Sequence, residues 1–202
     1  MLYELNVRQF TPEGTFAAAR ERLPFLRSLG IDAIWLMPIY PIGVEGRKGT
    51  LGSYYSIRDY KGINEEFGSE ADLRDFITAA HSLGMRVLLD WVANHTARDA
   101  RWLDDKPYDW YEREADGTAK VPWDWTDTAK LNYSNHDVGR GLIEAMRYWV
   151  EQFKVDGSAA IWLCWCLLSS GRRPLRSFTA SSVISLCLPK QRRITSSIVP
   201  LI

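Results

Sequence analysis

The segment DWVANH, at residues 90–95, places three side chains of different chemistry within six positions: Asp90, Asn94 and His95. A carboxylate accepts hydrogen bonds, an amide both donates and accepts them, and an imidazole exchanges a proton near neutral pH. Such a set can bind a polar ligand or support acid–base chemistry. The same residues can also serve structure alone, with Asp90 bonded to loop backbone and His95 satisfied in the core. The two interpretations stay open at this point.

The apolar run that precedes this motif indicates how the motif is positioned. Residues 85–92, MRVLLDWV, are short and apolar, which is typical of a strand buried on both faces of a parallel sheet. Residues 31–39 have the same character, and residues 2–7 predict a further short strand. Asp90 is therefore expected near the carboxyl end of a buried strand, where α/β proteins carry their ligand sites.

Helical spacing of apolar residues separates these strands. A capping box formed by Ser69 and Asp72 predicts the start of the second helix, and Pro24 is expected to kink or restart the first. The sequence KVDG, residues 154–157, follows the third helix and begins a fourth strand. The helices are predicted over residues 15–30, 69–84 and 135–153. Strands that alternate with helices favour an α/β fold with a parallel sheet.

Two connections, residues 40–68 and 93–134, are long and follow the carboxyl ends of strands, a position that is typical of functional loops in α/β barrels. The second connection is polar and rich in tryptophan. Flat aromatic faces beside acids and amides suit a sugar ring, and they also suit the packing of a small loop subdomain. The tryptophans concerned are Trp102, Trp110, Trp123 and Trp125.

Composition narrows the class of protein. The chain has 202 residues and a formal net charge of zero, so its bulk charge indicates neither a nucleic acid nor a membrane surface as partner. The N-terminus lacks the pattern of a signal peptide, and residues 1–157 contain no cysteine. We therefore expect a cytoplasmic protein.

The segment DWVANH resembles the first conserved region of the α-amylase family, glycoside hydrolase family 13, whose pattern is Asp-x-x-x-Asn-His. Further stretches resemble the same family in the family's order and with sensible spacing. Together the matches cover nearly all of residues 1–157. They are IDAIWLMPIYP (31–41), YSIRDY (55–60), INEEFGS (63–69) and LNYSNHDV (131–138).

This resemblance implies a fold and an activity. The fold would be the N-terminal half of a (β/α)8 TIM barrel, with strands 1–4 and a subdomain inserted after strand 3 at about residues 97–133. The activity would be retaining hydrolysis of α-glucosidic bonds in starch-like or maltodextrin substrates. Retention requires a nucleophile and a general acid whose carboxyl groups lie about 5–5.5 Å apart. The implied partner is an α-glucan or maltooligosaccharide.

The resemblance also implies roles for individual residues. Tyr55 would stack on the sugar at the cleavage site, His95 would hydrogen-bond the hydroxymethyl group of that sugar, and Asp90 would orient the catalytic centre. Asn94 would be a ligand in the calcium-dependent members. Calcium takes six to eight oxygen ligands and only Asn94 is matched, so the expectation for a cofactor is none or calcium.

The catalytic pattern of the family breaks off at Gly157. The nucleophile is expected in Gly-Phe-Arg-x-Asp on the fourth strand, but Ala159 occupies the arginine position and Ile161 the nucleophile position. No aspartate or glutamate follows Asp156, so the general acid has no counterpart either. The resemblance therefore implies that this chain is a truncated and inactive version of the enzyme.

Residues 158–202 differ from the rest of the chain in composition. They carry six basic residues, no acid and all three cysteines. A natural basic arm is one interpretation, and Cys164 and Cys166 could be a metal pair, although they lack further ligands. A reading-frame shift is the preferred interpretation, because one synonymous encoding of GSAAIWL, read from its third base, gives Phe-Arg-Cys-Asp-Met-Ala.

Two alternatives to an inactive glycosidase fragment remain. The chain could be a non-catalytic α-glucan-binding module that uses Tyr55, His95 and the loop tryptophans without an acid. The parent enzyme could also be a glucanotransferase or branching enzyme of the same family, because only the acceptor that resolves the glycosyl-enzyme differs.

Overall fold

A computed structural model of the chain describes residues 1–159. Its main sheet has four parallel strands in the order β1-β2-β3-β6, so the predicted α/β fold with a parallel sheet is confirmed. In register, Leu36 of β2 lies beside Leu89 of β3, and Asp90 lies beside Ala159 of β6. The strands are β1 Leu2–Leu5, β2 Ala33–Leu36, β3 Arg86–Asp90 and β6 Gly157–Ala159.

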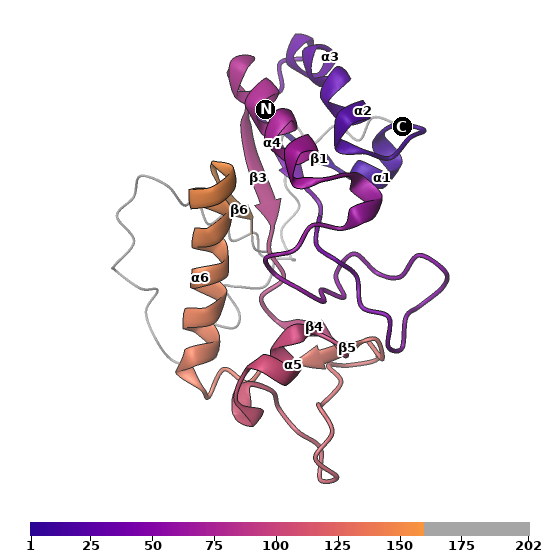
Figure 1. The fold of residues 1–202 in the computed structure, drawn as a ribbon, viewed down its shortest axis with the longest axis vertical. Coiled ribbons are helices and arrows are strands. Elements are labelled where there is room, and N and C mark those ends of the chain that lie inside the picture. The colour runs from indigo at the N-terminus through magenta and orange to yellow at the C-terminus, as the bar shows by residue number, and fades with distance from the viewer. Residues whose placement is uncertain (160–202) are drawn as a thin grey trace.

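Helices connect these strands and cover the sheet (Figure 1). The N-terminal ones are α1 Val7–Phe10, α2 Phe16–Glu21, α3 Leu23–Ser28 and α4 Glu70–Ser82, with the 3-10 turn η1 Glu65–Phe67 before α4. The later ones are α5 Arg101–Asp105, the 3-10 turn η2 Tyr108–Trp110 and the long helix α6 His136–Phe153. None of the helices in residues 1–159 is both long enough and apolar enough to cross a membrane.

Two of the predicted strands are shorter than the apolar runs that indicated them. The run 2–7 ends as a strand at Leu5, because the Asn6 carbonyl already accepts the first bonds of α1 from the N–H groups of Gln9 and Phe10. The run 31–39 contributes only β2, and Pro38, which has no N–H to give to a neighbouring strand, follows shortly after it.

The predicted restart at Pro24 is confirmed. The helix expected over residues 15–30 is divided into α2 and α3, and Pro24 lies in the first turn of α3, where its missing N–H costs nothing. The Thr15 hydroxyl caps α2 by accepting from the N–H of Ala18. Gly30 ends α3 with a φ of +81°, a conformation that other residues rarely adopt.

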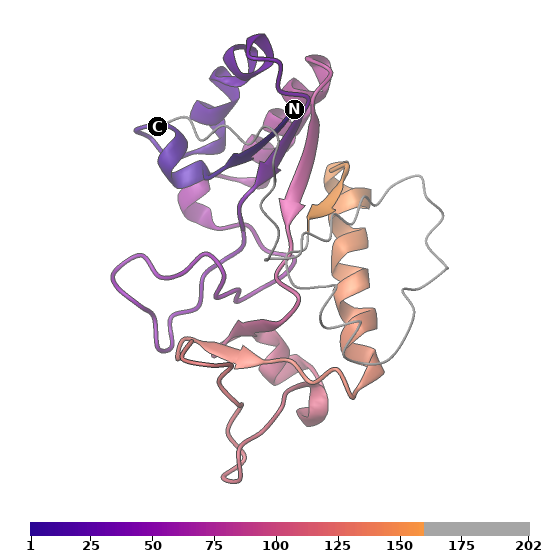
Figure 2. The same ribbon diagram turned by 180° about the vertical axis from the view of Figure 1, so that it is seen from behind.

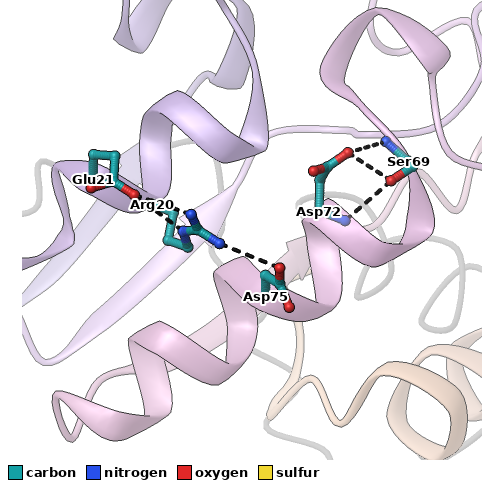
Figure 3. Close-up of polar contacts among 5 residues, drawn as sticks. All are labelled: Arg20, Glu21, Ser69, Asp72 and Asp75. Atoms are coloured by element: carbon teal, nitrogen blue, oxygen red, sulfur yellow. Dashed lines mark hydrogen bonds and ion pairs between the residues drawn. The ribbon is translucent and has the colours of Figure 1, made fainter.

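The predicted capping box of α4 is also confirmed (Figure 3). The Ser69 hydroxyl accepts from the N–H of Asp72 at 3.2 Å, and the Asp72 carboxylate accepts from the N–H of Ser69 at 2.8 Å. The same figure shows Arg20 of α2 reaching Asp75 of α4 at 3.3 Å, an exposed ion pair between two helices that pack together.

Residues between β3 and α6 form a second, separate sheet of two antiparallel strands, β4 His95–Ala97 and β5 Thr128–Lys130. Figures 1 and 2 show these strands and α5 below the carboxyl end of β3, apart from the parallel sheet. The second sheet lies where the subdomain was expected, but residues 97–133 as a domain stay a prediction.

The fourth strand, β6, contains Ala159, which occupies the position of the family's arginine. Ala159 ends β6, is buried, and its carbonyl accepts a hydrogen bond of 2.8 Å from the N–H of Trp91. Ile161 and the cysteines Cys164 and Cys166 lie outside the described residues, as does all of the 158–202 segment beyond Ala159.

Candidate functional site

A cavity of about 440 Å³ opens at the carboxyl end of β3, between the parallel sheet and the β4–β5 sheet. Three stretches of chain supply its walls: the loop after β2, the end of β3 with the residues that follow, and the start of β5. The lining residues are Lys48, Ser53, Tyr55, Asp90, Trp91, Val92, His95, Trp125, Asp127 and Thr128. Tyr55, Asp90 and His95, predicted from two separate motifs of the sequence, therefore share one cavity.

Asp90 lies at the inner wall of this cavity as the last residue of β3 and is 1% exposed. Its carboxylate accepts a hydrogen bond of 3.3 Å from the hydroxyl of Tyr55, and its carbonyl accepts one of 3.1 Å from Tyr40. Burial raises the pKa of Asp90 to about 7, against the opposing effect of the Tyr55 hydroxyl, and the charge of Glu4 adds to the increase. Asp90 can therefore hold or release a proton near neutral pH.

Tyr55 is fixed by the same contact. Burial raises the pKa of its hydroxyl, and the negative charges of Asp90 and Glu4 raise it further, so the hydroxyl stays protonated and donates to Asp90. Removal of that hydroxyl would take one hydrogen-bond donor from a buried carboxylate.

His95 is held by hydrogen bonds on both ring nitrogens. Nε2 lies 3.1 Å from the carbonyl of Tyr55, which can only accept, so Nε2 carries the hydrogen. Nδ1 then accepts from the amide nitrogen of Asn94 at 3.2 Å. Burial lowers the pKa of His95 to about 4, so the ring is neutral at pH 7. A bond to a hydroxymethyl group, as predicted, would have to share the Nε2 hydrogen with Tyr55, and that contact stays a prediction.

Asn94 bonds His95 through the nitrogen of its side-chain amide, and its backbone carbonyl accepts from the N–H of Leu131 at 3.2 Å. A calcium ion would instead bind the oxygen of that amide. Within residues 1–159 no group of three or more acidic, histidine or cysteine side chains is arranged to hold a metal. Calcium requires six to eight oxygen ligands and Asn94 is the one residue matched to it, so calcium stays a prediction.

The four loop tryptophans form two contacting pairs, and one member of the second pair lines the cavity. Trp102 and Trp110 pack edge to face, with ring centroids 5.2 Å apart, and Trp110 is buried in the core. Trp125 instead lines the cavity, where its ring meets His95 at 5.2 Å in an edge-to-face contact. Trp123 packs on Trp125 at 4.6 Å and is 57% exposed.

Sequence reasoning missed two charged residues of the cavity, Lys48 and Asp127. Asp127 is 3% exposed, and its carboxylate lies 3.7 Å from the Lys48 ammonium group. Lys48 also donates to the carbonyl of Asp124 at 3.3 Å, so it links the loop after β2 to the segment before β5. Neither residue belongs to a recognisable motif. Their place in the two long connections is the one signal in the sequence, with Lys48 in residues 40–68 and Asp127 in the tryptophan-rich residues 93–134.

The model of the α-amylase catalytic domain matches residues 7–128 of this sequence. The chain belongs to the α-amylase family. The chain is 34% identical over 174 residues to the α-amylase MalA of Haloarcula japonica, a match that covers 80% of the chain and 25% of the relative. It is 27% identical over 194 residues to an oligo-1,6-glucosidase of Heyndrickxia coagulans, with 78% of the chain and 34% of the relative covered.

Solved structures of α-amylases share the fold of this chain, which is part of a TIM barrel. A crystal structure of an α-amylase from Lactobacillus plantarum superposes with a TM-score of 0.77 at 41% identity, covering 81% of this chain and 38% of that one. A maltogenic α-amylase of Thermotoga neapolitana gives 0.73 at 40% identity, covering 79% and 38%. The α-amylase-family chain thus spans between a quarter and about two fifths of the length of these relatives, and its four strands are the first part of such a barrel.

Proposed function

We propose that this chain binds α-glucans or maltooligosaccharides in the cavity at the end of β3 and does not cleave them. The observation that carries the proposal is the shared wall of Tyr55, Asp90 and His95, fixed to one another by hydrogen bonds at 3.1–3.3 Å and faced by Trp125. Fixed polar groups beside an aromatic ring are what a hydroxylated ring with apolar faces requires.

The proposed lack of cleavage follows from the carboxylates. Retaining chemistry requires a nucleophile and a general acid on opposite sides of the bond. The cavity presents Asp90, which is bonded to Tyr55 and carries a raised pKa, and Asp127, which is paired with Lys48. The family position of the nucleophile is occupied by Ile161, and no acid follows Asp156 in the sequence.

Calorimetric titration with maltotriose and maltoheptaose tests the binding proposal, with a β-linked cellotriose as the sugar control. Replacement of Tyr55 by alanine should weaken maltotriose binding about tenfold, the loss expected when one aromatic contact of about 1.4 kcal/mol is removed. Tyr108→Ala is the matched control, since Tyr108 is 62% exposed and does not line the cavity. Equal affinities for maltotriose and cellotriose would contradict the proposal.

An assay of the purified chain on maltooligosaccharides and pullulan tests the proposed inactivity separately. We expect no release of reducing sugar above a control without protein, and turnover would contradict this part of the proposal. The localisation stays a prediction of a cytoplasmic protein, which fractionation of expressing cells would test.

A second proposal concerns the parent of this sequence. We infer that residues 158–202 are read out of frame and that the parent is a hydrolase or glucanotransferase of the family. The relatives include an oligo-1,6-glucosidase of Heyndrickxia coagulans, a maltosyltransferase of Rhodospirillum rubrum and a trehalose synthase of Pimelobacter, so their activities include both hydrolysis and transfer. The nucleotide sequence around codon 157 tests this inference: one restored base should give Phe-Arg-x-Asp followed by further barrel sequence.

A further inference from the structure

The carboxylate of Asp127 is the least satisfied charged group in the wall of the cavity. Its side chain is 4% exposed, and in residues 1–159 its Oδ2 atom has no hydrogen-bond partner. The contact of Oδ1 with Lys48 measures 3.7 Å, which is an ion pair but longer than a hydrogen bond. A carboxylate offers about four acceptor sites, and leaving them unused in a buried place is costly.

The backbone around Asp127 is fixed, so this position is set by the fold. The Asp127 carbonyl accepts a hydrogen bond of 2.8 Å from the buried hydroxyl of Ser56, which lies on the loop after β2. Thr128, the next residue, begins β5 and pairs with Ala97 of β4. The carboxylate therefore reaches the cavity from the end of a strand. The torsion about its Cβ–Cγ bond has a broad range of allowed angles, so either oxygen can turn toward the cavity.

The surroundings of Asp127 indicate what kind of ligand group could supply the missing hydrogen bond to its carboxylate. Lys48 already supplies one positive charge, and the described residues hold no cluster of acidic, histidine or cysteine ligands, so a metal cation does not fit. An anion would meet the negative charge of Asp127. A neutral hydroxyl fits both partners, because its hydrogen can go to Asp127 while its oxygen accepts from Lys48.

We propose that Asp127 is a specificity-determining residue that accepts a hydrogen bond from a hydroxyl group of the sugar bound in this cavity, with Lys48 holding the carboxylate in place. The proposal rests on the proposed function, since it names a contact to the same α-glucan ligand. Trp125, two residues earlier, lines the same cavity and offers the apolar surface beside which that hydroxyl would lie.

The test compares two carboxylate-to-amide variants by calorimetric titration with maltotriose. Asp127→Asn should weaken binding about tenfold, because a hydrogen bond to a charged acceptor is replaced by one to a neutral acceptor. Asp124→Asn is the matched control: it removes the same charge three residues away, on an exposed side chain that does not line the cavity. It should change the affinity by less than about twofold, as expected of a surface charge toward a neutral ligand.

A panel of monodeoxy maltotrioses separates a ligand contact from a structural role. One member of the panel should lose about tenfold in affinity for the unmodified chain and should bind Asp127→Asn as well as maltotriose does, the signature of a removed pair. If Asp127 only braces the loops, every deoxy sugar loses the same factor in both proteins, and the proposal is overturned.

The outcomes for this proposal and for the proposed function are distinct. If the unmodified chain does not bind maltotriose, the proposed function fails and this contact fails with it. If the unmodified chain binds maltotriose and Asp127→Asn behaves like Asp124→Asn, only the role of Asp127 is overturned.

Discussion

The parallel-sheet region, residues 1–91, and the segment that follows it up to β5 build opposite walls of one cavity by different means. In the first region each element has a local cause: a cap, an apolar run or a helix-ending glycine. The β4–β5 segment is held instead by side chains that bond distant backbone, such as Ser56 to the Asp127 carbonyl. On the sheet wall, the carboxylate and the carbonyl of Asp90 both accept hydrogen bonds, whereas on the opposite wall one carboxylate oxygen of Asp127 has no hydrogen-bond partner within residues 1–159.

The largest expected effect tests whether the parallel-sheet region carries the stability of the chain. Phe76 of α4 is fully buried and packs against Phe16, with ring centroids 6.3 Å apart. Phe76→Ala should lower the free energy of unfolding by about 3–5 kcal/mol through lost burial and a cavity. Phe25→Ala, the same substitution at a side chain that is 56% exposed, should change it by less than about 0.5 kcal/mol. Urea unfolding measures both, and equal losses would refute this assignment.

A second prediction concerns the two titrating groups at the boundary between the walls. The pKa of Asp90 is raised to about 7, so the folded chain binds this proton more tightly than the unfolded chain, and stability falls as pH rises from about 4 to 7. The pKa of His95 is lowered to about 4, so here the unfolded chain binds the proton more tightly. Stability from His95 is full above about pH 6.5 and is lost as pH falls toward 4.

The contributions of Asp90 and His95 change the free energy of unfolding with pH in opposite directions. They should nearly cancel in the unmodified chain, so each becomes visible only when the other residue is replaced. Asp90→Asn leaves the His95 slope, so stability should rise by about 3 kcal/mol from pH 4 to pH 6.5. His95→Gln leaves the Asp90 slope, so stability should fall by about 4 kcal/mol from pH 4 to pH 7. Urea unfolding across this range measures each profile. Slopes of the same sign in the two variants would show that one of the two pKa shifts is assigned wrongly.

The same contrast explains how much of the molecule can be predicted from sequence. The strand before Asp90, the capping box at Ser69 and the break at Pro24 depend on residues a few positions apart, so local patterns predict them. Local patterns overextended the first strand to residues 2–7, because the turn of α1 competes for the carbonyl of Asn6.

The residues of the cavity also differ in whether local sequence patterns predict them. Tyr55, Asp90 and His95 belong to motifs and were predicted to meet a sugar. Asp127 and Lys48 are 79 residues apart in the sequence. Their charged groups lie 3.7 Å apart only because two long loops approach each other. No spacing in the sequence encodes such a contact, and the sequence did not show which of the loop tryptophans would line the cavity.

The β4–β5 wall can be loosened at its anchoring serine. Ser56→Ala removes the hydroxyl that donates to the Asp127 carbonyl, both of which belong to buried residues. The free energy of unfolding should fall by about 1–2 kcal/mol, the cost of an unsatisfied buried carbonyl. Maltotriose affinity should fall as well, since Asp127 loses its fixed position. Urea unfolding and calorimetry measure the two effects, and unchanged affinity despite lower stability would separate the anchor from the cavity.

The smallest expected effect comes from the same substitution at a serine that does not contact the β4–β5 wall. Ser69→Ala deletes the cap of α4, which should cost about 1 kcal/mol of stability. Because α4 packs on α2 and contacts β3, away from the cavity, maltotriose affinity should stay unchanged. Ser134→Ala, at an exposed residue that does not line the cavity, controls for the loss of a hydroxyl and should alter neither quantity. The pair Ser56→Ala and Ser69→Ala therefore compares the anchor of the β4–β5 wall with a cap far from it: a drop in affinity for Ser69→Ala equal to that for Ser56→Ala would mean that binding follows overall stability and not the anchor.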